Sequence, residues 1–333
     1  MELGKLGQIF SAREIFDLLH DDLLRVESEI GLESVASVDA VTTIGQYLQK
    51  SGGKRLRPAL LLLCAKLVGE SGPSAIRLGA VVEILHAATL VHDDVIDMAQ
   101  TRRGRPSSNV QWGNHICVLS GDWLYMQAFQ IALRERNFHI LDLLISLTQM
   151  MVEGELIQLE RIGKIDVSEA DCMELADRKT AGLFSVCARL GAVCGGADSA
   201  LEDKLGDYAW NLGMAFQVVD DLLDFTAREK TLGKPVGGDL KEGKVTLPLV
   251  YALESATPEE RRMVETVLRE RSYDTVPFRD ILALIEKYDS IQRVQERAHQ
   301  FTGKSRQIMA EFPDSSYQRA LVAVVNIVTD RDH

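Results

Sequence analysis

The chain has 333 residues, a hydrophobic content of 46% and a formal net charge of −12 at pH 7. This hydrophobic content is that of an ordinary globular protein and excludes wholesale disorder. The acidic balance argues against non-specific nucleic-acid binding, which needs a basic face. The five cysteines are scattered and never spaced as C-x-x-C. That pattern argues against a disulfide framework and a structural zinc site, and it favours a reducing, cytoplasmic compartment.

Membrane insertion is not expected. The N-terminal residues do not combine a basic segment with a following apolar core, so we predict no signal peptide. The most apolar run, residues 59–69, is 11 residues long and contains Lys66. It is too short to cross a bilayer and predicts a buried helix instead.

Helical periodicity dominates the chain in sequence order. Residues 11–30 place apolar side chains at three- and four-residue steps, which predicts one amphipathic helix. Further long apolar helices are predicted over residues 75–97, 137–160 and 205–225. Near the C-terminus, Thr257, Pro258 and Glu260 have the spacing of an N-cap, a first helical proline and a capping box.

The segments between these helices read as loops, namely residues 69–74, 101–114 and 231–248. No alternating strand pattern flanked by hairpin turns is found. We therefore predict one all-α domain over residues 1–333. The part from residue 255 onward carries no recognisable chemistry and is interpreted as scaffold.

An acidic motif ends the helix predicted over residues 75–97. Asp93 and Asp97 are four residues apart and project from one helix face, while Asp94 lies about 100° round the helix. The run before them is apolar on most of its circumference, so unpaired carboxylates would be costly to bury there. A solvated helix end is one interpretation; a cation held between the carboxylates is the other.

A second motif repeats the D-D-x-x-D spacing 127 residues later, at Asp220, Asp221 and Asp224. Two such motifs on separate helices can face each other across a bundle and form a multi-metal site. Oxygen ligands suit Mg²⁺ or Mn²⁺ rather than zinc. Because Mg²⁺ commonly completes its octahedron with phosphate oxygens, the motifs predict a phosphate-bearing substrate.

Basic clusters accompany the first motif. One follows Gly52 and Gly53 and the other follows Asp97; together they contain Lys54, Arg55, Arg57, Arg102, Arg103 and Arg105. Guanidinium groups match phosphate oxygens bidentately, and lysine acts as a point charge. Either cluster alone would usually be solvated surface, but their position beside the acidic motifs favours an active-site cleft.

The strings "GGKRLRP", "LVHDDVIDMAQTRRGRP", "FQVVDDLLDF" and "GKVTLP" occur in this order between about residues 44 and 249. Together they resemble the trans-isoprenyl diphosphate synthases, also called the polyprenyl synthetase family. The resemblance implies an all-α helical bundle with a central active-site cavity, usually a homodimer. It implies that an allylic diphosphate is condensed with isopentenyl diphosphate, with two or three Mg²⁺ ions that Mn²⁺ can replace.

The resemblance also implies roles for individual residues. The direct Mg²⁺ ligands would be Asp93, Asp97 and Asp220, and further or water-mediated ligands would be Asp94, Asp221 and Asp224. Isopentenyl diphosphate contacts would be Lys54, Arg57, His86 and Arg103. Allylic diphosphate contacts would be Arg102, Lys179 and Lys234, with Lys244 in a loop that varies within the family. The polar residues facing the developing carbocation would be Thr180 and Gln217.

The physical requirements of that reaction agree with these residues. Fixed cations and Mg²⁺ would stabilise charge developing on the departing diphosphate. An apolar channel would keep water from the carbocation. No side-chain base is conspicuous near the motifs, so the released diphosphate is the hypothetical proton acceptor.

Product length is predicted from Ala88 and Thr89, one helical turn before Asp93. Both are small, whereas short-chain members of the family often have an aromatic residue there. Their size predicts a deep pocket and a product longer than C20, which Ala88→Phe would shorten. The alternative is that Ala88 is small for helix packing and that residues 125–133 form the floor, which leaves a short-chain farnesyl or geranylgeranyl product open.

Two other functions remain as alternatives. A class I terpene cyclase would have an N-S-E-type second motif and no isopentenyl diphosphate site. A non-catalytic diphosphate-binding subunit would have a broken acidic motif. Here both D-D-x-x-D motifs and the "GGKRLRP" string are intact.

Overall fold

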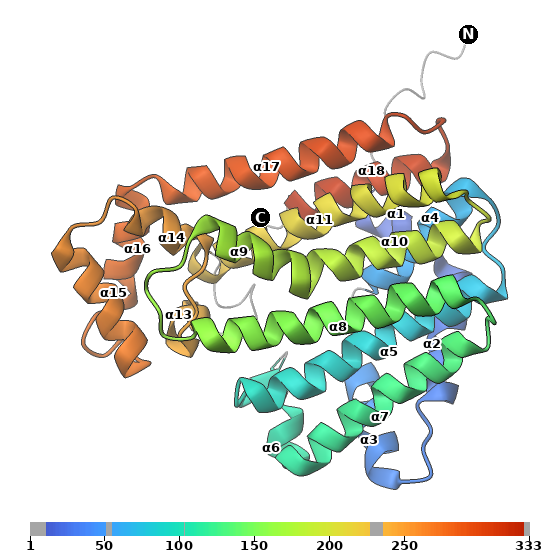
Figure 1. The fold of residues 1–333 in the computed structure, drawn as a ribbon, viewed down its shortest axis with the longest axis horizontal. Coiled ribbons are helices and arrows are strands. Elements are labelled where there is room, and N and C mark those ends of the chain that lie inside the picture. The colour runs from blue at the N-terminus through green and yellow to red at the C-terminus, as the bar shows by residue number, and fades with distance from the viewer. Residues whose placement is uncertain (1–10, 51–54, 103, 227–235, 330–333) are drawn as a thin grey trace.

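The computed structural model describes residues 11–50, 55–102, 104–226 and 236–329, and almost all of this chain is helical (Figure 1). The N-terminal half contains α1 (Ala12–Leu18), α2 (His20–Glu33), α3 (Asp39–Lys50), α4 (Leu56–Val68), α5 (Pro73–Ile96), α6 (Ser108–Trp112) and α7 (Asn114–Leu133). The middle contains α8 (Phe138–Arg161), α9 (Glu169–Ala176), a π-helical turn η1 (Asp177–Ala181), α10 (Gly182–Cys194) and α11 (Ser199–Thr226). These elements confirm the predicted all-α fold.

The C-terminal part contains α13 (Gly238–Glu242), α14 (Leu247–Leu253), α15 (Pro258–Glu270), α16 (Phe278–Lys287), α17 (Ser290–Met309) and α18 (Ser316–Thr329). In Figure 1, α13 to α16 gather at one end of the bundle, while α17 runs along α11. The expected capping box is present: the Thr257 hydroxyl accepts from the Glu260 N–H, and the Glu260 carboxylate accepts from the Thr257 N–H.

The centre of the bundle is built from helices that are apolar on all sides. In α4, every residue from Pro58 to Ala65 is buried, which confirms the buried helix predicted over residues 59–69. The α4 and α10 backbones touch, because a Cβ on Gly191 would lie 2.3 Å from the Leu61 carbonyl oxygen. Among the described helices, α5 alone has the length and apolar composition of a membrane span. Its burial inside the bundle accounts for that composition.

Two local predictions need correction. The single helix predicted over residues 11–30 is broken at Leu19, so that α1 ends at Leu18 and α2 begins at His20. Leu19 is nevertheless buried. The three- and four-residue spacing of apolar side chains therefore runs through the break, and the sequence does not reveal it. The predicted loop over residues 101–114 contains a short antiparallel ladder, β1 (Thr101–Arg102) and β2 (Arg105–Pro106), in addition to α6.

Candidate active site

A cavity of about 380 Å³ lies between α5, α8, η1 and α11. It brings together many of the residues that the sequence singled out. These are Arg57, His86, Thr89, Asp93, Lys179, Thr180, Gln217, Asp220, Asp221 and Lys244. The cavity therefore joins both acidic motifs with cationic and polar side chains from five separate segments.

Helix periodicity explains how two of these segments reach the cavity. On α5, His86, Thr89 and Asp93 recur at steps of three and four residues and so share one face. On α11, Gln217 and Asp221 are also four residues apart, and the Gln217 amide donates to the Asp221 carboxylate at 2.8 Å. The Thr180 hydroxyl donates to the Gln217 amide oxygen at 2.6 Å, which links η1 to the second motif.

The π-helical turn η1 presents Lys179 and Thr180 to the cavity. Short π segments are uncommon and frequently mark functional sites. Close packing surrounds this turn: a Cβ on Gly213 would lie 2.6 Å from Ala181 Cα, and a Cβ on Gly154 would lie 2.9 Å from Arg178 Cβ. Its first residue, Asp177, accepts a hydrogen bond from the Trp210 indole N–H at 2.6 Å.

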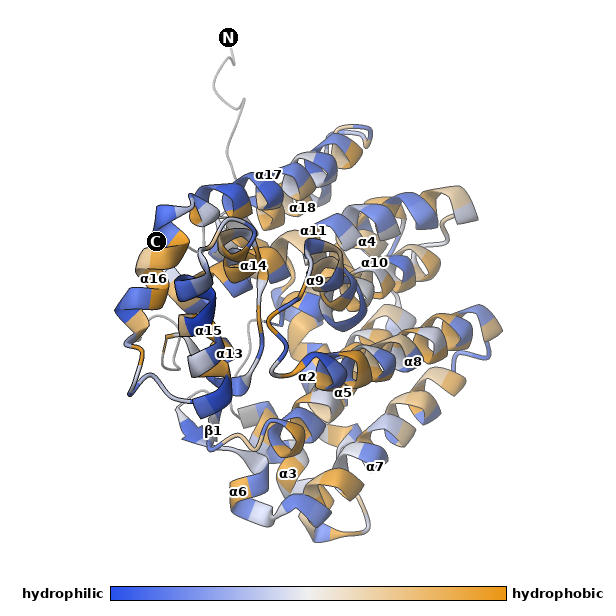
Figure 2. Cartoon of the chain, turned by 60° about the vertical axis from the view of Figure 1, so that its left-hand side comes forward, coloured by the Kyte–Doolittle hydropathy of each residue, from blue (hydrophilic) through white to orange (hydrophobic). Residues whose placement is uncertain are grey.

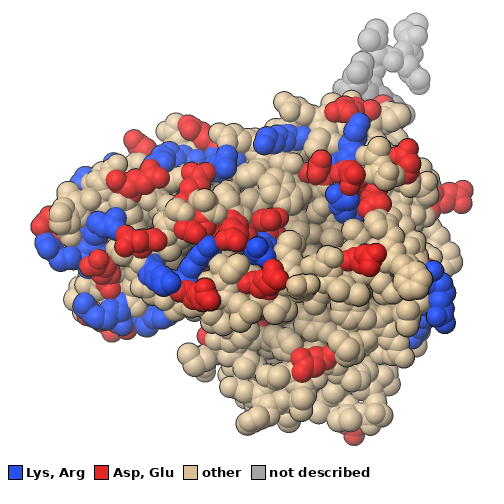
Figure 3. Space-filling model, in the orientation of Figure 1, with Lys and Arg blue, Asp and Glu red and all other residues tan. Residues whose placement is uncertain are grey.

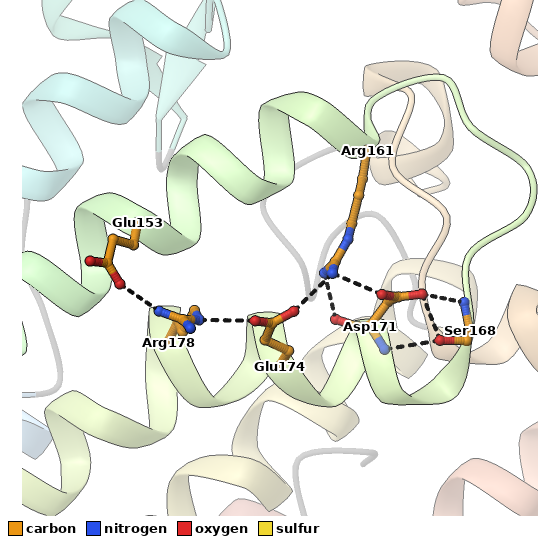
Figure 4. Close-up of polar contacts among 6 residues, drawn as sticks. All are labelled: Glu153, Arg161, Ser168, Asp171, Glu174 and Arg178. Atoms are coloured by element: carbon orange, nitrogen blue, oxygen red, sulfur yellow. Dashed lines mark hydrogen bonds and ion pairs between the residues drawn. The ribbon is translucent and has the colours of Figure 1, made fainter.

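A chain of ion pairs fixes α9 and η1 against α8 (Figure 4). Arg178 joins Glu153 of α8 at 2.8 Å to Glu174 of α9 at 3.3 Å. Arg161, at the end of α8 and in the cavity wall, contacts Glu174 and Asp171, each at 2.8 Å. These partly exposed pairs act as a network, which holds geometry better than isolated surface pairs do.

Lys179 already has anionic and polar partners on α8. Its Nζ lies 2.5 Å from Glu155 Oε1 and 2.9 Å from Gln158 Oε1. Lys244 is likewise paired, with its Nζ 3.2 Å from Asp97 Oδ1 and 2.8 Å from Glu242 Oε2. Burial alone would lower the pKa of Lys244, but Asp97 and Glu242 outweigh it and raise that pKa.

The cavity carboxylates are poorly stabilised as anions. Burial, with the nearby Glu155 charge, raises the pKa of Asp93 to about 7. Burial and the neighbouring Asp239 raise the pKa of Asp221 well above its ordinary value. Among the described side chains, no three potential ligands converge on one ready-made metal position. Oxygen donors that need a cation but do not enclose one fit Mg²⁺, which keeps water and phosphate oxygens in its shell.

The first motif does not act as one unit. The Asp94 side chain is completely buried and lines neither this cavity nor the apolar cavity beside it. Its Oδ1 accepts from Arg102 Nε at 2.6 Å, and its Oδ2 accepts from the Ser108 N–H at 2.9 Å and hydroxyl at 2.8 Å. These contacts hold the loop that carries Arg102, and the metal or catalytic role expected for Asp94 stays a prediction.

The second motif divides in the same way at a different position. Asp224 is buried outside the cavity lining, and its two carboxylate oxygens accept from the Gly238 and Asp239 N–H groups at 3.2 and 3.1 Å. Asp224 thus holds the backbone at the start of α13, and its expected role as a metal ligand stays a prediction. Asp239, whose N–H donates to Asp224, lines the cavity.

Among the polar cavity residues that were not predicted from the sequence are Glu155, Gln158, Arg161 and Asp239. The only available signals were the "GGD" string in a predicted loop and the four-residue spacing of Glu155 from Met151 on a helix. Three expected residues, Lys54, Arg103 and Lys234, lie outside the described residues. Arg55, from the same basic cluster as Arg57, instead pairs with Glu27 and Glu83 and ties α4 to α2 and α5.

A second cavity of about 310 Å³ adjoins the first, and Thr89, Asp93, Met151 and Lys179 line both. Its other lining residues come from α5, α7 and α8 and are largely apolar. Thr89 lies at the junction, whereas Ala88 is completely buried and lines neither cavity. Of these two residues, Thr89 lines both cavities and Ala88 lines neither, so the role of the pair in setting product length stays a prediction. Tyr125 of α7 also lines the second cavity.

Comparisons with known proteins agree with this geometry. The polyprenyl synthetase family model matches residues 38–285. An octaprenyl diphosphate synthase from Haemophilus influenzae is 34% identical over 329 residues, covering 99% of this chain and 100% of the relative. A geranylgeranyl diphosphate synthase from Sulfolobus acidocaldarius is 35% identical, covering 80% and 88%. A crystal structure of a polyprenyl synthase from Caulobacter crescentus, complexed with calcium and isoprenyl diphosphate, superimposes with a TM-score of 0.92 at 33% identity, covering 98% and 100%.

Proposed function

Because this chain belongs to the polyprenyl synthetase family and is therefore a trans-polyprenyl diphosphate synthase, we propose that it extends an allylic diphosphate with isopentenyl diphosphate. The all-trans product is longer than C20. The observation that carries this proposal is one cavity lined by both acidic motifs and continued by an apolar cavity at Thr89. Charged groups thus surround one end of the substrate and apolar groups the other.

Diphosphate binding falls to the cations that the family resemblance assigns to it, of which Lys179, Arg57 and His86 line the first cavity. Lys179 and Arg102, together with Lys234, would hold the allylic diphosphate. Arg57 and His86, which line the same cavity, would hold isopentenyl diphosphate together with Lys54 and Arg103. To bind diphosphate, Lys179 would exchange its contact with Glu155, whose Oε1 lies 2.5 Å from its Nζ, for phosphate oxygens.

Enzymes of this family depend on Mg²⁺, and the oxygen donors described above fit that ion. Asp93, Asp97 and Asp220 are the proposed direct ligands, with Asp221 and Asp239 nearby. We propose two or three ions, with Mn²⁺ as a substitute. When bound, the ions supply positive charge to the departing diphosphate oxygens.

The remaining steps rest on the chain's own residues. The allylic C–O bond breaks and its electron pair leaves with the diphosphate. Thr180 and Gln217 line the cavity, where the dipoles of their oxygens would favour the allylic cation. The double bond of isopentenyl diphosphate then attacks, and the released diphosphate takes the proton that the adduct loses. Apolar side chains of the second cavity exclude water from the cation.

Thr89, which lies where the two cavities meet, supports a long product. Thr89 is small, so no aromatic side chain from α5 closes the passage between the two cavities. Octaprenyl and nonaprenyl relatives match 99% and 90% of this chain. Short-chain relatives reach similar identity, so the cavity and not the overall identity carries this part of the proposal.

We propose a single catalytic domain over residues 1–333, a homodimer and a cytoplasmic location. The described cysteines form no disulfide and four of the five are buried, which fits a reducing compartment.

The test is an assay of purified protein with an allylic diphosphate, labelled isopentenyl diphosphate and Mg²⁺, with and without chelator. We expect chelator-sensitive elongation and a product longer than C20 by mass analysis. A dominant C15 or C20 product would overturn the long-chain part. Hydrocarbon formed from the allylic substrate alone would establish a cyclase, and no turnover would establish a binding subunit.

A further inference from the structure

Arg55 precedes α4 in a backbone conformation that arginine rarely adopts. It is the N-cap of this helix, yet its φ of 45° and ψ of 35° lie in the left-handed region. N-cap residues are ordinarily extended, and a residue with a Cβ is strained at positive φ. Such strain persists only where the surrounding structure enforces it, and it is concentrated at functional sites. The contacts that hold Arg55 therefore bear on Arg57, two residues later, which lines the active-site cavity.

The Arg55 guanidinium is held by groups from three other helices. Its Nε and Nη2 donate to the Glu27 carboxylate of α2, Nη2 at 3.3 Å, and its Nη1 donates to Glu83 of α5 at 2.8 Å. Gln49 of α3 accepts from Arg55 at 3.4 Å through its carbonyl oxygen and donates to Glu27 at 2.9 Å through its amide. Burial alone would lower the pKa of Arg55, but the hydrogen bonds and charges of Glu27 and Glu83 raise it. We call these four residues the Arg55 network.

Close helix packing supports the network. Helix α2 runs beside α5 (Figure 2), and both contact α4. A Cβ on Gly79 of α5 would lie 3.1 Å from Val26 Cγ2 and 3.7 Å from Pro58 Cβ. In the chain, Val26 precedes Glu27 of the network and Pro58 follows Arg57. The network is therefore attached to tightly packed backbone and can hold the start of α4 in one position.

Glu83 is a largely buried carboxylate. Figure 3 shows many acidic side chains on the surface, crowded at the end that carries α13 to α16, where water screens their charge. By contrast, the Glu83 side chain is 11% exposed and its partner Arg55 is 17% exposed. Glu83 Oε2 has no hydrogen-bond partner in the part of the chain that the structure describes. A buried carboxylate needs a cation, so this ion pair restricts where the Arg55 side chain can lie.

The Arg55 network borders the active-site cavity. Glu83 and His86 are three residues apart on α5 and share one face. A small cavity of about 40 Å³ is lined by Arg55, Glu83 and His86, and His86 also lines the cavity of about 380 Å³. Arg57 lines that larger cavity as well, with its guanidinium 5.8 Å from the Phe184 ring centroid. The network thus adjoins two residues that are proposed to hold isopentenyl diphosphate.

We propose that Arg55 is a positioning residue for isopentenyl diphosphate: held by Glu27 and Glu83, it fixes the left-handed turn before α4 and thereby keeps Arg57 in place at the cavity. The inference rests on the proposed function and adds to it a residue that does not touch the substrate. Arg55 lines neither the active-site cavity nor the apolar cavity beside it. Its two carboxylate partners also leave one negative charge in excess, which would repel a diphosphate.

The test is Glu27→Gln/Glu83→Gln, which releases the guanidinium while Arg55 itself stays intact. The matched control is Glu33→Gln on the same helix α2, where the carboxylate pairs with Arg134 and the side chain is 14% exposed. Steady-state assays with Mg²⁺ give kcat and the KM of each substrate, and circular dichroism checks folding.

We expect the double variant to raise KM for isopentenyl diphosphate about tenfold, as for one weakened charge-assisted hydrogen bond to the substrate. KM for the allylic diphosphate and kcat should change by less than about twofold, because the lost contact binds ground state and transition state alike. The control should keep all three wild-type values. If Arg55 instead bound diphosphate directly, removing its competing carboxylates would lower KM for isopentenyl diphosphate, so the two roles predict opposite signs.

Arg55→Lys decides the matter where the double variant fails to fold, because it keeps a positive charge beside Glu83. An ammonium is a point charge and cannot serve two carboxylates as the guanidinium fork does, so this variant should also raise KM for isopentenyl diphosphate several-fold and selectively.

An unchanged or lower KM for isopentenyl diphosphate in the double variant would overturn the inference. So would equal rises of both KM values, which mark a general structural effect, or wild-type kinetics in Arg55→Lys. Failure of the proposed function reads differently, since the wild type itself would then show no Mg²⁺-dependent condensation.

Discussion

Asp93 and Asp94 are neighbours with the same side chain, yet their conversion to asparagine should change the stability of the metal-free protein in opposite directions. Asp94 accepts three hydrogen bonds, from Arg102 and twice from Ser108, and is completely buried. Asp94→Asn turns an amide N–H₂ toward these donors and removes the charge that pairs with Arg102. Breaking a buried ion pair destabilises by about 3–5 kcal/mol; because the Arg102 side chain is 29% exposed, we expect about 3 kcal/mol.

Asp93 has the opposite problem, because its pKa is raised from 3.8 to about 7. Between these two pH values the folded state binds more protons than the unfolded state, so this group lowers metal-free stability as the pH rises through that window. At about 1.36 kcal/mol per unit, the penalty reaches as much as about 4 kcal/mol at pH 8. Asp93→Asn removes it, so the variant should be more stable than the wild type at pH 8 and nearly equal near pH 4.

The measurement is urea unfolding followed by circular dichroism, in chelator, at several pH values, with Mg²⁺ added in a second series. Mg²⁺ should stabilise the wild type and reduce the advantage of Asp93→Asn. The reasoning is refuted if Asp94→Asn raises stability in chelator, or if Asp93→Asn lowers it at pH 8.

The remaining predictions concern the tail passage and the π turn. Thr89→Phe should shorten the product because Thr89 lines both cavities. Ala88→Phe should mainly lower the free energy of unfolding, by about 1–3 kcal/mol, because the completely buried Ala88 has no free space around it. Product length is measured by mass analysis and stability by urea unfolding, and a product shortened by Ala88→Phe alone would contradict the passage assigned to Thr89. Trp210→Phe removes the hydrogen bond to Asp177 at the start of η1, which is worth about 1 kcal/mol. Because η1 carries Lys179, KM for the allylic substrate should rise about fivefold, while KM for isopentenyl diphosphate stays unchanged. Equal changes in both KM values would show a general structural effect.

Much of the fold follows from the sequence because its signals are periodic. The long apolar runs became α5, α8 and α11, and the capping box at Thr257 starts α15 where expected. The break at Leu19 was missed because that residue keeps its buried position while the backbone turns. Residue spacing reports which side chains are buried, but it does not report a one-residue change of backbone direction.

The division of labour within the two motifs could not be predicted from spacing. Asp94 and Asp224 take different places in the same D-D-x-x-D string, and each accepts hydrogen bonds from a segment distant in sequence. The choice between Ala88 and Thr89 depended on the rotation of α5 about its axis. That helix is apolar nearly all round, so its sequence does not indicate which side faces the cavity.

Asp239 and Glu155 were missed for a related reason. Each is one acidic residue in a segment without a recognisable chemical pattern, and only the fold brings it to the cavity. By contrast, the paired acidic residues and the clustered arginines were conspicuous in the sequence because repetition set them apart.

The ion pairs within the site have a consequence for turnover. In the described chain, Lys179, Lys244 and Arg102 each already contact a carboxylate, from Glu155, Asp97 and Asp94. An incoming diphosphate therefore exchanges partners with these carboxylates, and it displaces few counterions from solution. We expect substrate affinity to depend only weakly on ionic strength. The same carboxylates compete with diphosphate for the cations after each condensation, so they should increase the rate at which diphosphate dissociates.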